Sequence, residues 1–314
     1  MTLPIAIPVE PAFRELPVLD FLGVLWPERS KDGIRELFAK GAVRFDGRPV
    51  SPHAVARECP DLQLHADPEA LPAIHLSANE ETSGVKLVHE DDRIAVVEKP
   101  SGVPVVPNRG RASPSCLGFL IRREMASRAG KPRSEFRRIR VVHRIDRATS
   151  GLVILARTLE AEIGLARLFE ASQVHKKYIA LLSGEVAPAA IGVNVPIGEG
   201  RKGRMRAGPG GKESYTEFIV LERLPGFTLV RALPRTGRTH QIRVHAWAIG
   251  HPLAVDPLYR VGPAAKTPSP PAIRRLTLHA ERLVLPESWP GAREFFALLP
   301  EDMKAAIEAL RGMQ

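Results

Sequence analysis

The stretch VVHRIDRATSGLVILAR, residues 141–157, places a single carboxylate in a loop that leads directly into an apolar strand. In this loop Asp146 stands between Arg144 and Arg147, and nearby guanidinium groups favour the charged form of a carboxylic acid. Residues 152–156 are continuously apolar, which is typical of a strand buried on both faces. Because such a strand is rigid, it fixes the direction in which the loop presents its carboxylate. We therefore interpret the stretch as an active-site loop.

A second stretch, RTGRTHQIRVHAWAIGHPLAVDPLY at residues 235–259, carries several arginines and histidines on a predicted short helix. Thr239 is a residue type that caps helix N-termini, and Gly250 is one that follows helix ends. Helical spacing predicts a buried stripe, which comprises Ile242, Ala246 and Ile249. The residues expected to share another face of the helix are His240, Arg243 and Trp247.

The charge of the whole chain indicates the class of partner. The 314 residues include 45 Lys and Arg against 35 Asp and Glu, which gives a formal net charge of +10. Such a chain is attracted to polyanions, of which nucleic acid is the commonest. The sequence does not begin with a basic segment and an apolar core, and no run reaches the roughly 18 apolar residues of a spanning helix. We expect a soluble, cytoplasmic protein that does not bind a membrane.

Cysteine and histidine spacing gives no indication of a metal site. Cys59 and Cys116 lie far apart and neither belongs to a Cys-x-x-Cys pair, so neither a disulfide framework nor a zinc site is indicated. Four histidines could suggest a metal site but lack a Cys or acidic residue at a recurrent ligand spacing: His143, His240, His245 and His251. We expect no metal, and a reducing compartment.

The N-terminal part predicts a small module of helices and a hairpin. Apolar residues recur at helical spacing after residue 30 until Gly41, and Asp46-Gly47 is a strong hairpin signal. The stretch PVLDFLGVLWPERSKDGIRELFAKGAVRFDGRPV resembles the S4 RNA-binding module, although the family usually has arginine where Val18 and Lys31 stand. The alternative is an ordinary amphipathic helix and hairpin without a partner.

The remaining sequence predicts an α+β domain. Its many strands, few helices and hairpin-length connections favour a mostly antiparallel mixed β-sheet with flanking helices and a central cleft, rather than an alternating βαβ fold. Residues 201–212, rich in Arg, Lys and Gly, are expected to form a flexible cationic loop suited to a phosphate backbone. We expect four segments: a leader at 1–15, the S4-like module at 16–55, a linker at 56–80 and a catalytic domain at 81–314.

Three motifs of this domain occur in the order of a known family. HRIDRATSGLVILAR, KKYIALLSGEV and RTGRTHQIRVHAWAIGHPLAVDPLY, with EKPSGVPVVP before them and RLTLHAERLVLP after them, resemble the RluA family of pseudouridine synthases over about residues 85–285. The resemblance implies an enzyme that isomerises uridine in ribosomal or transfer RNA and needs no cofactor or metal. We also expect a monomer. The competing hypothesis is a non-catalytic RNA-binding or ribosome-assembly factor on the same fold.

The resemblance also implies roles for individual residues. Asp146 is the expected catalytic carboxylate, Arg243 its ion-pair partner, and Tyr178 the aromatic residue that stacks on the target uracil. An ionised carboxylate can attack the sugar or base or remove a sugar proton, and the sequence leaves these routes open. Without the motifs, the three residues would be interpreted as a structural loop aspartate, a surface arginine and a packing tyrosine.

Arg144 matches the family position that enters the RNA helix and holds the target nucleotide out. Base extrusion is required because a stacked, paired uridine hides the bonds that are remade. The alternative for Arg144 is a phosphate contact that only positions the RNA. Further RNA contacts are expected from His143, Arg147, Arg238 and His240. One departure from the family pattern is Ala254-Val255-Asp256, where the family usually has Gly-Asp, and neither Asp256 nor Tyr259 is expected to take part in the chemistry.

Overall fold

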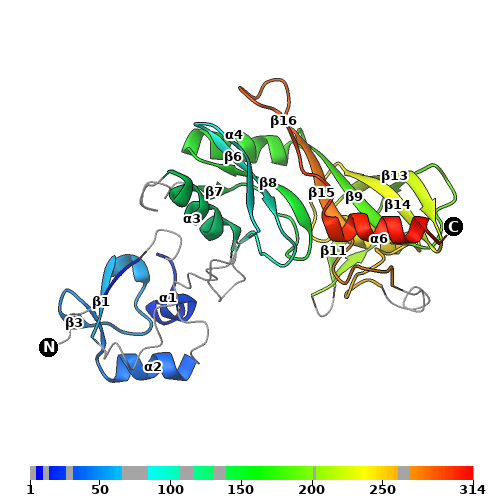
Figure 1. Ribbon diagram of the computed structural model, residues 1–314. Coiled ribbons are helices and arrows are strands. Elements are labelled where there is room, and N and C mark those ends of the chain that lie inside the picture. The colour runs from blue at the N-terminus through cyan, green and yellow to red at the C-terminus, as the bar shows by residue number, and fades with distance from the viewer. Residues whose placement is uncertain are drawn as a thin grey trace. The chain divides into compact units, whose positions relative to one another are not determined.

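The computed structural model describes residues 5–9, 14–25, 31–65, 84–106, 116–129, 139–200, 203–260 and 269–313. The chain divides into two compact units (Figure 1), one formed by Met1–Gly84 with Val106–Arg138 and the other by Val85–Val105 with Ile139–Gln314. Within the described ranges, none of the helices has both the length and the apolar character required to cross a bilayer.

The first unit contains a four-stranded antiparallel sheet in the order β1-β4-β2-β3. The strands are β1 (Ile5–Pro8), β2 (Val43–Phe45), β3 (Arg48–Pro49) and β4 (Asp61–Leu64), and the helices are α1 (Val18–Leu25), α2 (Lys31–Ala39), the 3-10 helix η2 (Ala56–Glu58) and α3 (Leu117–Ala129). Asp46 and Gly47 both have positive φ, 48° and 72°, as a two-residue hairpin turn requires. The predicted helix after residue 30 and the hairpin are therefore confirmed.

The limits expected for the N-terminal module need correction. β1 lies in the range expected to be a leader, and β4 lies in the range expected to be a linker. Both strands belong to the sheet, and Ile7, Leu62 and Leu64 are buried in its core. A two-stranded hairpin buries too little apolar surface to be stable, so the added strands complete the core.

The second unit is built on a ten-stranded sheet whose main path runs β10-β13-β14-β9-β15-β8-β6-β5. Every strand pair in it is antiparallel except β15 with β8, which confirms the predicted α+β class with a mostly antiparallel mixed sheet. The strands are β5 (Lys86–Glu90), β6 (Ile94–Lys99), β7 (Arg140–Val141), β8 (Ser150–Ala156), β9 (His175–Ser183), β10 (Ala190–Asn194), β13 (Tyr215–Leu224), β14 (Phe227–Pro234), β15 (Leu278–Val284) and β16 (Glu294–Phe296).

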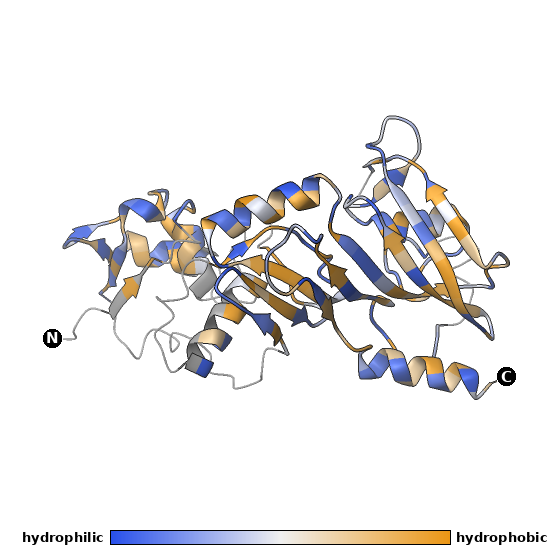
Figure 2. Ribbon diagram, turned by 90° about the horizontal axis from the view of Figure 1, so that it is seen from above, coloured by the Kyte–Doolittle hydropathy of each residue, from blue (hydrophilic) through white to orange (hydrophobic). Residues whose placement is uncertain are grey.

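Helices cover both faces of this sheet: α4 (Leu159–Glu170), α5 (Gln241–Ala248) and α6 (Glu301–Arg311). Successive residues of β9 point to opposite faces, so Ile179 and Leu181 pack with α6, whereas Ala180 and Leu182 pack with α5. The hydrophobic and hydrophilic stretches of α6 alternate along the helix (Figure 2), which fits its one buried face. The ten-stranded sheet thus carries α5, and with it Arg243, on one face.

The strand that follows the Asp146 loop is buried along its whole length, as predicted. Gly151 in β8 has φ of 111° and lies against the backbone of Ala280 in β15, where a Cβ atom would collide with the Ala280 carbonyl. A glycine is therefore needed for the two strands to approach. This close pairing anchors the C-terminal end of the Asp146 loop to the centre of the sheet.

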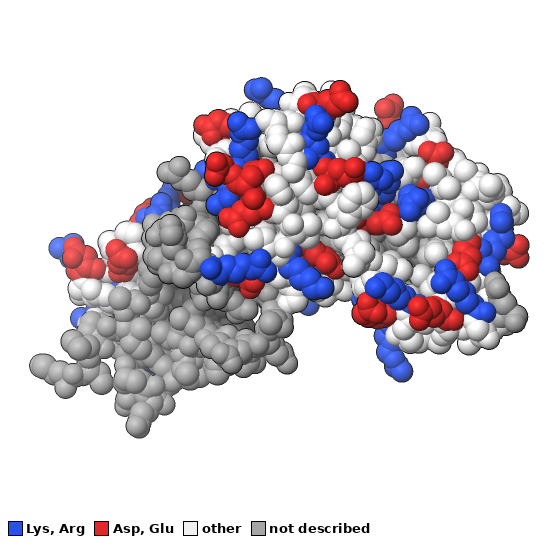
Figure 3. Space-filling model, turned by 45° about the horizontal axis from the view of Figure 1, so that its top comes forward, with Lys and Arg blue, Asp and Glu red and all other residues white. Residues whose placement is uncertain are grey.

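The cationic segment differs from the expectation of a flexible loop in its described part. Met205–Ala207 forms β12, which pairs with β11 (Ile197–Glu199) as a small antiparallel ribbon. The amide of Met205 donates to the Tyr259 hydroxyl at 2.7 Å, which ties the ribbon to the segment after α5. Arg201 and Lys202 lie outside the described residues. Figure 3 shows one face of the molecule, where basic side chains lie among acidic ones rather than forming a patch of one sign.

Candidate active site

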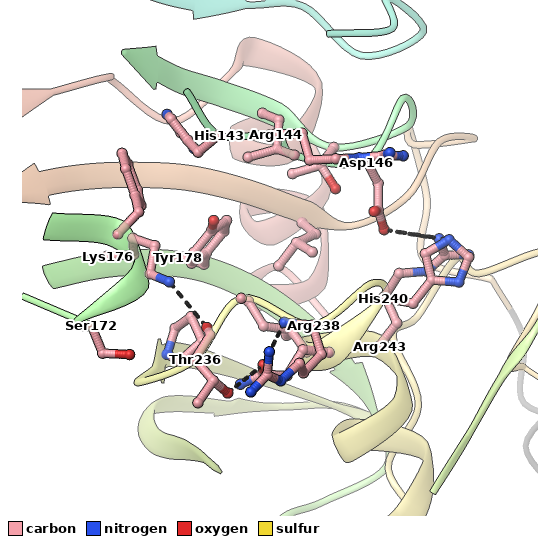
Figure 4. Close-up of a pocket in the computed structure, with 18 of the residues that line it drawn as sticks. His143, Arg144, Asp146, Ser172, Lys176, Tyr178, Thr236, Arg238, His240 and Arg243 are labelled. Atoms are coloured by element: carbon pink, nitrogen blue, oxygen red, sulfur yellow. Dashed lines mark hydrogen bonds and ion pairs between the residues drawn. The ribbon is translucent and has the colours of Figure 1, made fainter. Parts of the chain in front are cut away.

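A cavity of about 580 Å³ opens in the second unit, a size typical of small-molecule sites. It is lined by the loop before β8, the end of α4, β9 and the segment that enters α5. Asp146, Tyr178 and Arg243 all line it, as do Arg144 and His240 (Figure 4). Residues from distant parts of the sequence are thus brought together, and the cavity provides the expected cleft.

Asp146 is held by an ion pair at one end of this cavity. Its Oδ2 accepts a hydrogen bond from Nη1 of Arg243 at 3.0 Å, and Nε2 of His240 lies 3.9 Å from the same oxygen. The carboxylate side chain is 20% exposed, so it remains accessible to a ligand. In the described part of the chain no residue donates a hydrogen bond to its Oδ1.

The partner of Asp146 is itself fixed by a second carboxylate. Nε and Nη2 of Arg243 each donate to Asp256, to Oδ2 and Oδ1 respectively, at 2.8 Å. Burial by itself would lower the pKa of Arg243, but the hydrogen bonds and charges of Asp256 and Asp146 outweigh it and raise the pKa. The guanidinium is therefore permanently charged, and its planar fork is oriented with one edge on Asp256 and one nitrogen toward Asp146.

From the sequence, Asp256 and Tyr259 were expected to have no part in the chemistry, and in the structure they contact Arg243 and His240, which line the cavity. Oδ1 of Asp256 accepts from the amides of Leu258 and Tyr259, which fixes the carboxylate under Arg243. The hydroxyl of Tyr259 lies 2.9 Å from Nδ1 of His240. Charge balance could have pointed to Asp256 from the sequence. A buried arginine that pairs with an active-site carboxylate is better stabilised when a second negative group lies beside it.

His240 lies between the Tyr259 hydroxyl and Asp146. The amide of Met205 donates to the Tyr259 hydroxyl, which leaves that hydroxyl able to donate to Nδ1 of His240. Burial lowers the pKa of His240, against the opposing charge of Asp146, so the ring is neutral. In the tautomer whose Nδ1 accepts from Tyr259, the proton of the neutral ring lies on Nε2, the atom that faces Asp146.

β9 places Lys176 and Tyr178 on the cavity wall. They are two residues apart and therefore share one face of the sheet. Burial, and then the charge of Asp146, raise the pKa of Tyr178, so its phenol stays protonated. Nζ of Lys176 donates to the carbonyl of Thr236 at 3.0 Å, and burial lowers the pKa of this lysine to about 8. Lys176 was not among the predicted site residues.

The ion-pair partner of Asp146 is the expected Arg243, and neither of the two arginines that flank it in sequence takes this place. Arg144 is exposed at the cavity wall, and Arg147 is exposed, does not line the cavity and donates from Nε to the carbonyl of Gly102 at 2.7 Å. Neither forms an ion pair with Asp146, whose partner is Arg243 from α5. Residues adjacent in sequence to a loop aspartate project in other directions, whereas α5 lies directly opposite the loop.

The remaining predicted residues have structural contacts at the cavity. Nε2 of His143 accepts from the amide of Ile154 at 2.9 Å, and its ring stacks on Phe169 with centroids 4.4 Å apart. Burial, with the charge of Lys176, lowers the pKa of His143 to about 3, so this ring is neutral and braces the loop. Arg238 is exposed at the cavity wall and donates from Nε to the carbonyl of Glu213 at 3.0 Å.

The helix that carries Arg243 buries the predicted Ile242 and Ala246, but it differs from the prediction at its N-cap and at Trp247. Its N-cap is His240, in the left-handed conformation with φ of 56°, rather than Thr239. Arg243 is 4% exposed whereas Trp247 is 40% exposed, so the two do not share an environment. Two carboxylates draw Arg243 inward, and helical spacing alone could not show this. Gly250 follows the helix with φ of 84°, as predicted.

The end of β6 and the segment that follows it hold the Asp146 loop through hydrogen bonds from two side chains. Nζ of the fully buried Lys99 donates to the carbonyl of Arg147 at 3.1 Å, and Oγ of Ser101 donates to the carbonyl of Ala148 at 2.7 Å. Burial lowers the pKa of Lys99 to about 7, against the opposing charge of Asp146. The loop is thereby held at two successive carbonyls just after Asp146. No group of three potential metal ligands occurs among the residues that the structure describes.

Comparison with known proteins shows which family this chain resembles. The family model for RNA pseudouridylate synthase matches residues 93–248. The ribosomal large subunit pseudouridine synthase D of Nitrosomonas europaea is 36% identical over 236 residues, which are 73% of this chain and 66% of that protein. The protein of the same name from Pseudomonas aeruginosa is 32% identical over 297 residues, 91% of this chain and 89% of that protein. The structure of human RNA pseudouridylate synthase domain containing 4 covers 72% of this chain and 93% of its own, at 25% identity and a TM-score of 0.59.

Proposed function

This chain belongs to the RNA pseudouridylate synthase family, and we propose that Asp146 is the carboxylate with which it isomerises uridine in RNA. The observation that supports the assignment is the buried ion pair between Arg243 and Asp256, which turns one guanidinium nitrogen toward Asp146 at the cavity wall. A carboxylate held in this way is charged and oriented before substrate arrives.

The reaction requires the uracil to leave C1′ of the ribose through N1 and return through C5. The N1–C1′ bond breaks, the C5–C1′ bond forms, C5 loses its proton and N1 gains one, so the product is an isomer of the substrate. Asp146 serves this chemistry by attacking the sugar or the base, or by removing a proton from the sugar. Each route needs an ionised carboxylate beside the nucleoside, which is the state that Arg243 favours.

Tyr178 supplies the surface on which the detached base turns. Its ring, whose hydroxyl stays protonated, lines the cavity together with Asp146 and Lys176. A stacked pyrimidine can rotate on such an aromatic face without losing contact. Arg144 is exposed at the cavity wall, where it can occupy the gap that an extruded nucleotide leaves in an RNA helix. The positions of both side chains at the cavity wall support these roles.

We assign ribosomal RNA as the substrate because the relatives that span most of this chain carry that substrate in their names. The test is to incubate the purified protein with unmodified ribosomal RNA and with unmodified transfer RNA, and to measure pseudouridine by mass spectrometry. Pseudouridine at defined positions of ribosomal RNA is the expected result. Pseudouridine only in transfer RNA would show that transfer RNA is the substrate. Pseudouridine in neither RNA would favour a non-catalytic RNA-binding factor. Neither Cys59 nor Cys116 forms a disulfide in the described part of the chain, which supports the reducing cytoplasm of this proposal.

The N-terminal sheet and helices form an RNA-binding module in this proposal. Arg35 of α2 and Arg48 of β3 are exposed on it, where cations can contact phosphates. Replacing both by Gln should weaken RNA binding at low salt and reduce the slope of log affinity against log salt by about 0.9 for each phosphate that the variant no longer neutralises. An unchanged slope would show that this surface does not bind RNA.

A further inference from the structure

We propose that Lys176 identifies the target base, because its ammonium donates a hydrogen bond to the C4 carbonyl oxygen of the extruded uracil. This inference rests on the proposed function and adds a specificity-determining residue to it. Cytosine has an amino group at C4 in place of the oxygen. An ammonium at that point therefore accepts uridine and opposes cytidine, since two donors would face each other.

The order of side chains along the cavity places Lys176 at the far end from the sugar. Ser150, where the Asp146 loop enters β8, pairs with His279, which in turn pairs with Ile179. Across β15, the loop before Ser150 is therefore level with the part of β9 that lies C-terminal to Tyr178. Lys176 lies on the other side, two residues N-terminal to Tyr178 and about 6.6 Å along the strand. Figure 4 shows the same order, with Tyr178 between Asp146 and Lys176.

This order determines which edge of the base meets the lysine. A uracil stacked on Tyr178 with its sugar at Asp146 has N1 directed toward Asp146. The C4 carbonyl lies across the ring from N1, so it is directed toward Lys176. The phosphates are attached to the sugar and therefore lie at the Asp146 end, near the exposed Arg144.

The environment of Lys176 leaves its ammonium available to a ligand. One N–H is used by the carbonyl of Thr236 at 3.0 Å, and an ammonium has three. Within the described residues no Asp or Glu forms an ion pair with it, and Glu170, which also lines the cavity, is exposed. Gly237 has no side chain to cover Nζ, which lies 3.8 Å from the point where its Cβ would be.

A half-buried ammonium without a carboxylate partner loses part of its hydration, which a ligand with a negative or strongly polar group can replace. The extruded base supplies one during the reaction. When the N1–C1′ bond breaks, the electron pair stays on N1 and delocalises onto the carbonyl oxygens at C2 and C4. A cation at the C4 oxygen therefore binds the detached base more strongly than the attached one, which favours detachment.

The experiment is a double-mutant cycle between the lysine and the oxygen. Two synthetic stem-loops carry the mapped ribosomal target site, one with uridine and one with the pyrimidin-2-one ribonucleoside, which lacks the C4 oxygen. Binding is measured in the Asp146→Asn background to prevent turnover. With Lys176 present, removal of the oxygen should weaken binding roughly tenfold to hundredfold, as for one hydrogen bond to a charged group. In Lys176→Met the two RNAs should bind equally.

Control variants separate this role from the alternatives. Lys177→Met changes the next residue of the strand, which does not line the cavity, and should keep the full preference for the uridine RNA. Lys176→Gln keeps a polar group whose amide can either donate or accept, so it should narrow the difference in affinity between target uridine and target cytidine. This second variant preserves the test if Lys176→Met does not fold.

The outcomes distinguish the lysine from the proposed function. The inference would be overturned if removal of the C4 oxygen weakened binding equally in Lys176→Met and in the protein that keeps Lys176. It would also be overturned if Lys176→Met bound both RNAs more weakly to the same extent and with a smaller salt dependence, because that result indicates a phosphate contact. If the wild-type protein forms pseudouridine in the uridine stem-loop and the cycle shows no coupling, only the role of Lys176 fails. Absence of pseudouridine from that RNA would refute the proposed function instead.

Discussion

Replacing Asp256 by Asn tests whether a second carboxylate holds Arg243 against the reactive one. Asp256 accepts two hydrogen bonds from the guanidinium at 2.8 Å and two more from the amides of Leu258 and Tyr259. Asn keeps one oxygen, which can still accept from the amides and from Nη2. Its amide nitrogen then faces Nε of Arg243, so a donor meets a donor.

The expected magnitudes follow from that exchange. One hydrogen bond to a charged group contributes about 1.5–3 kcal/mol, and removing one partner of a buried ion pair costs about 3–5 kcal/mol. Arg243 keeps Asp146 as a partner, so we expect the free energy of unfolding to fall by about 3 kcal/mol. The displaced guanidinium orients Asp146 less well, and we expect the single-turnover rate to fall at least about tenfold, which corresponds to about 1.4 kcal/mol.

The assay combines urea unfolding with single-turnover formation of pseudouridine at saturating enzyme. Glu222→Gln is the matched control, because Arg311 makes the same two-nitrogen contact with Glu222 at the surface, at 2.9 and 2.6 Å. That pair is exposed, so the control should lose less than about 1 kcal/mol of stability and keep the wild-type rate. A wild-type rate in Asp256→Asn would refute the idea that Asp256 orients the site through Arg243.

Three further perturbations test other parts of the proposed site. Tyr178→Ala should weaken RNA binding by about 1–3 kcal/mol because the base no longer stacks, whereas Tyr178→Phe should bind normally; equal binding by both variants in a filter assay would exclude the stacking role. Arg144→Ala should slow modification of a paired target uridine more than that of an unpaired one, and rates reduced equally on both RNAs would indicate a phosphate contact. Because burial lowers the pKa of His143 to about 3, the unfolded chain, with a histidine pKa near 6.5, binds more protons between these values. Stability should therefore fall as the pH drops below about 6.5, and His143→Gln should flatten this dependence in urea unfolding, whereas an unchanged slope would show that His143 does not cause it.

The strands and turns could be predicted from the sequence because their signals are local. The apolar run of β8, the Asp46-Gly47 turn and the glycine after α5 each depend on a few adjacent residues. β1 and β4 were missed because each is short and is stabilised by pairing with a partner distant in sequence. A leader and a linker rich in proline show no periodicity of their own, so long-range pairing overrides their local appearance.

The site residues that belong to the family motifs could be predicted from the sequence. The residues whose role depends on contacts with other elements could not. Asp146, Tyr178 and Arg243 were identified through motifs, and the structure places all three at one cavity. Asp256 and Lys176 were missed because a second carboxylate under an arginine and a lysine on a strand face gain meaning only from three-dimensional neighbours.

The role of Asp146 is tested most directly by comparing wild type with Asp146→Asn on unmodified ribosomal RNA. The substitution keeps the size of the side chain and a hydrogen-bond acceptor for Arg243 but removes the negative charge. We predict that the variant binds the RNA as wild type does and forms no pseudouridine, whereas wild type modifies its target. Pseudouridine formation by Asp146→Asn at the wild-type rate would contradict the assignment of the reactive carboxylate.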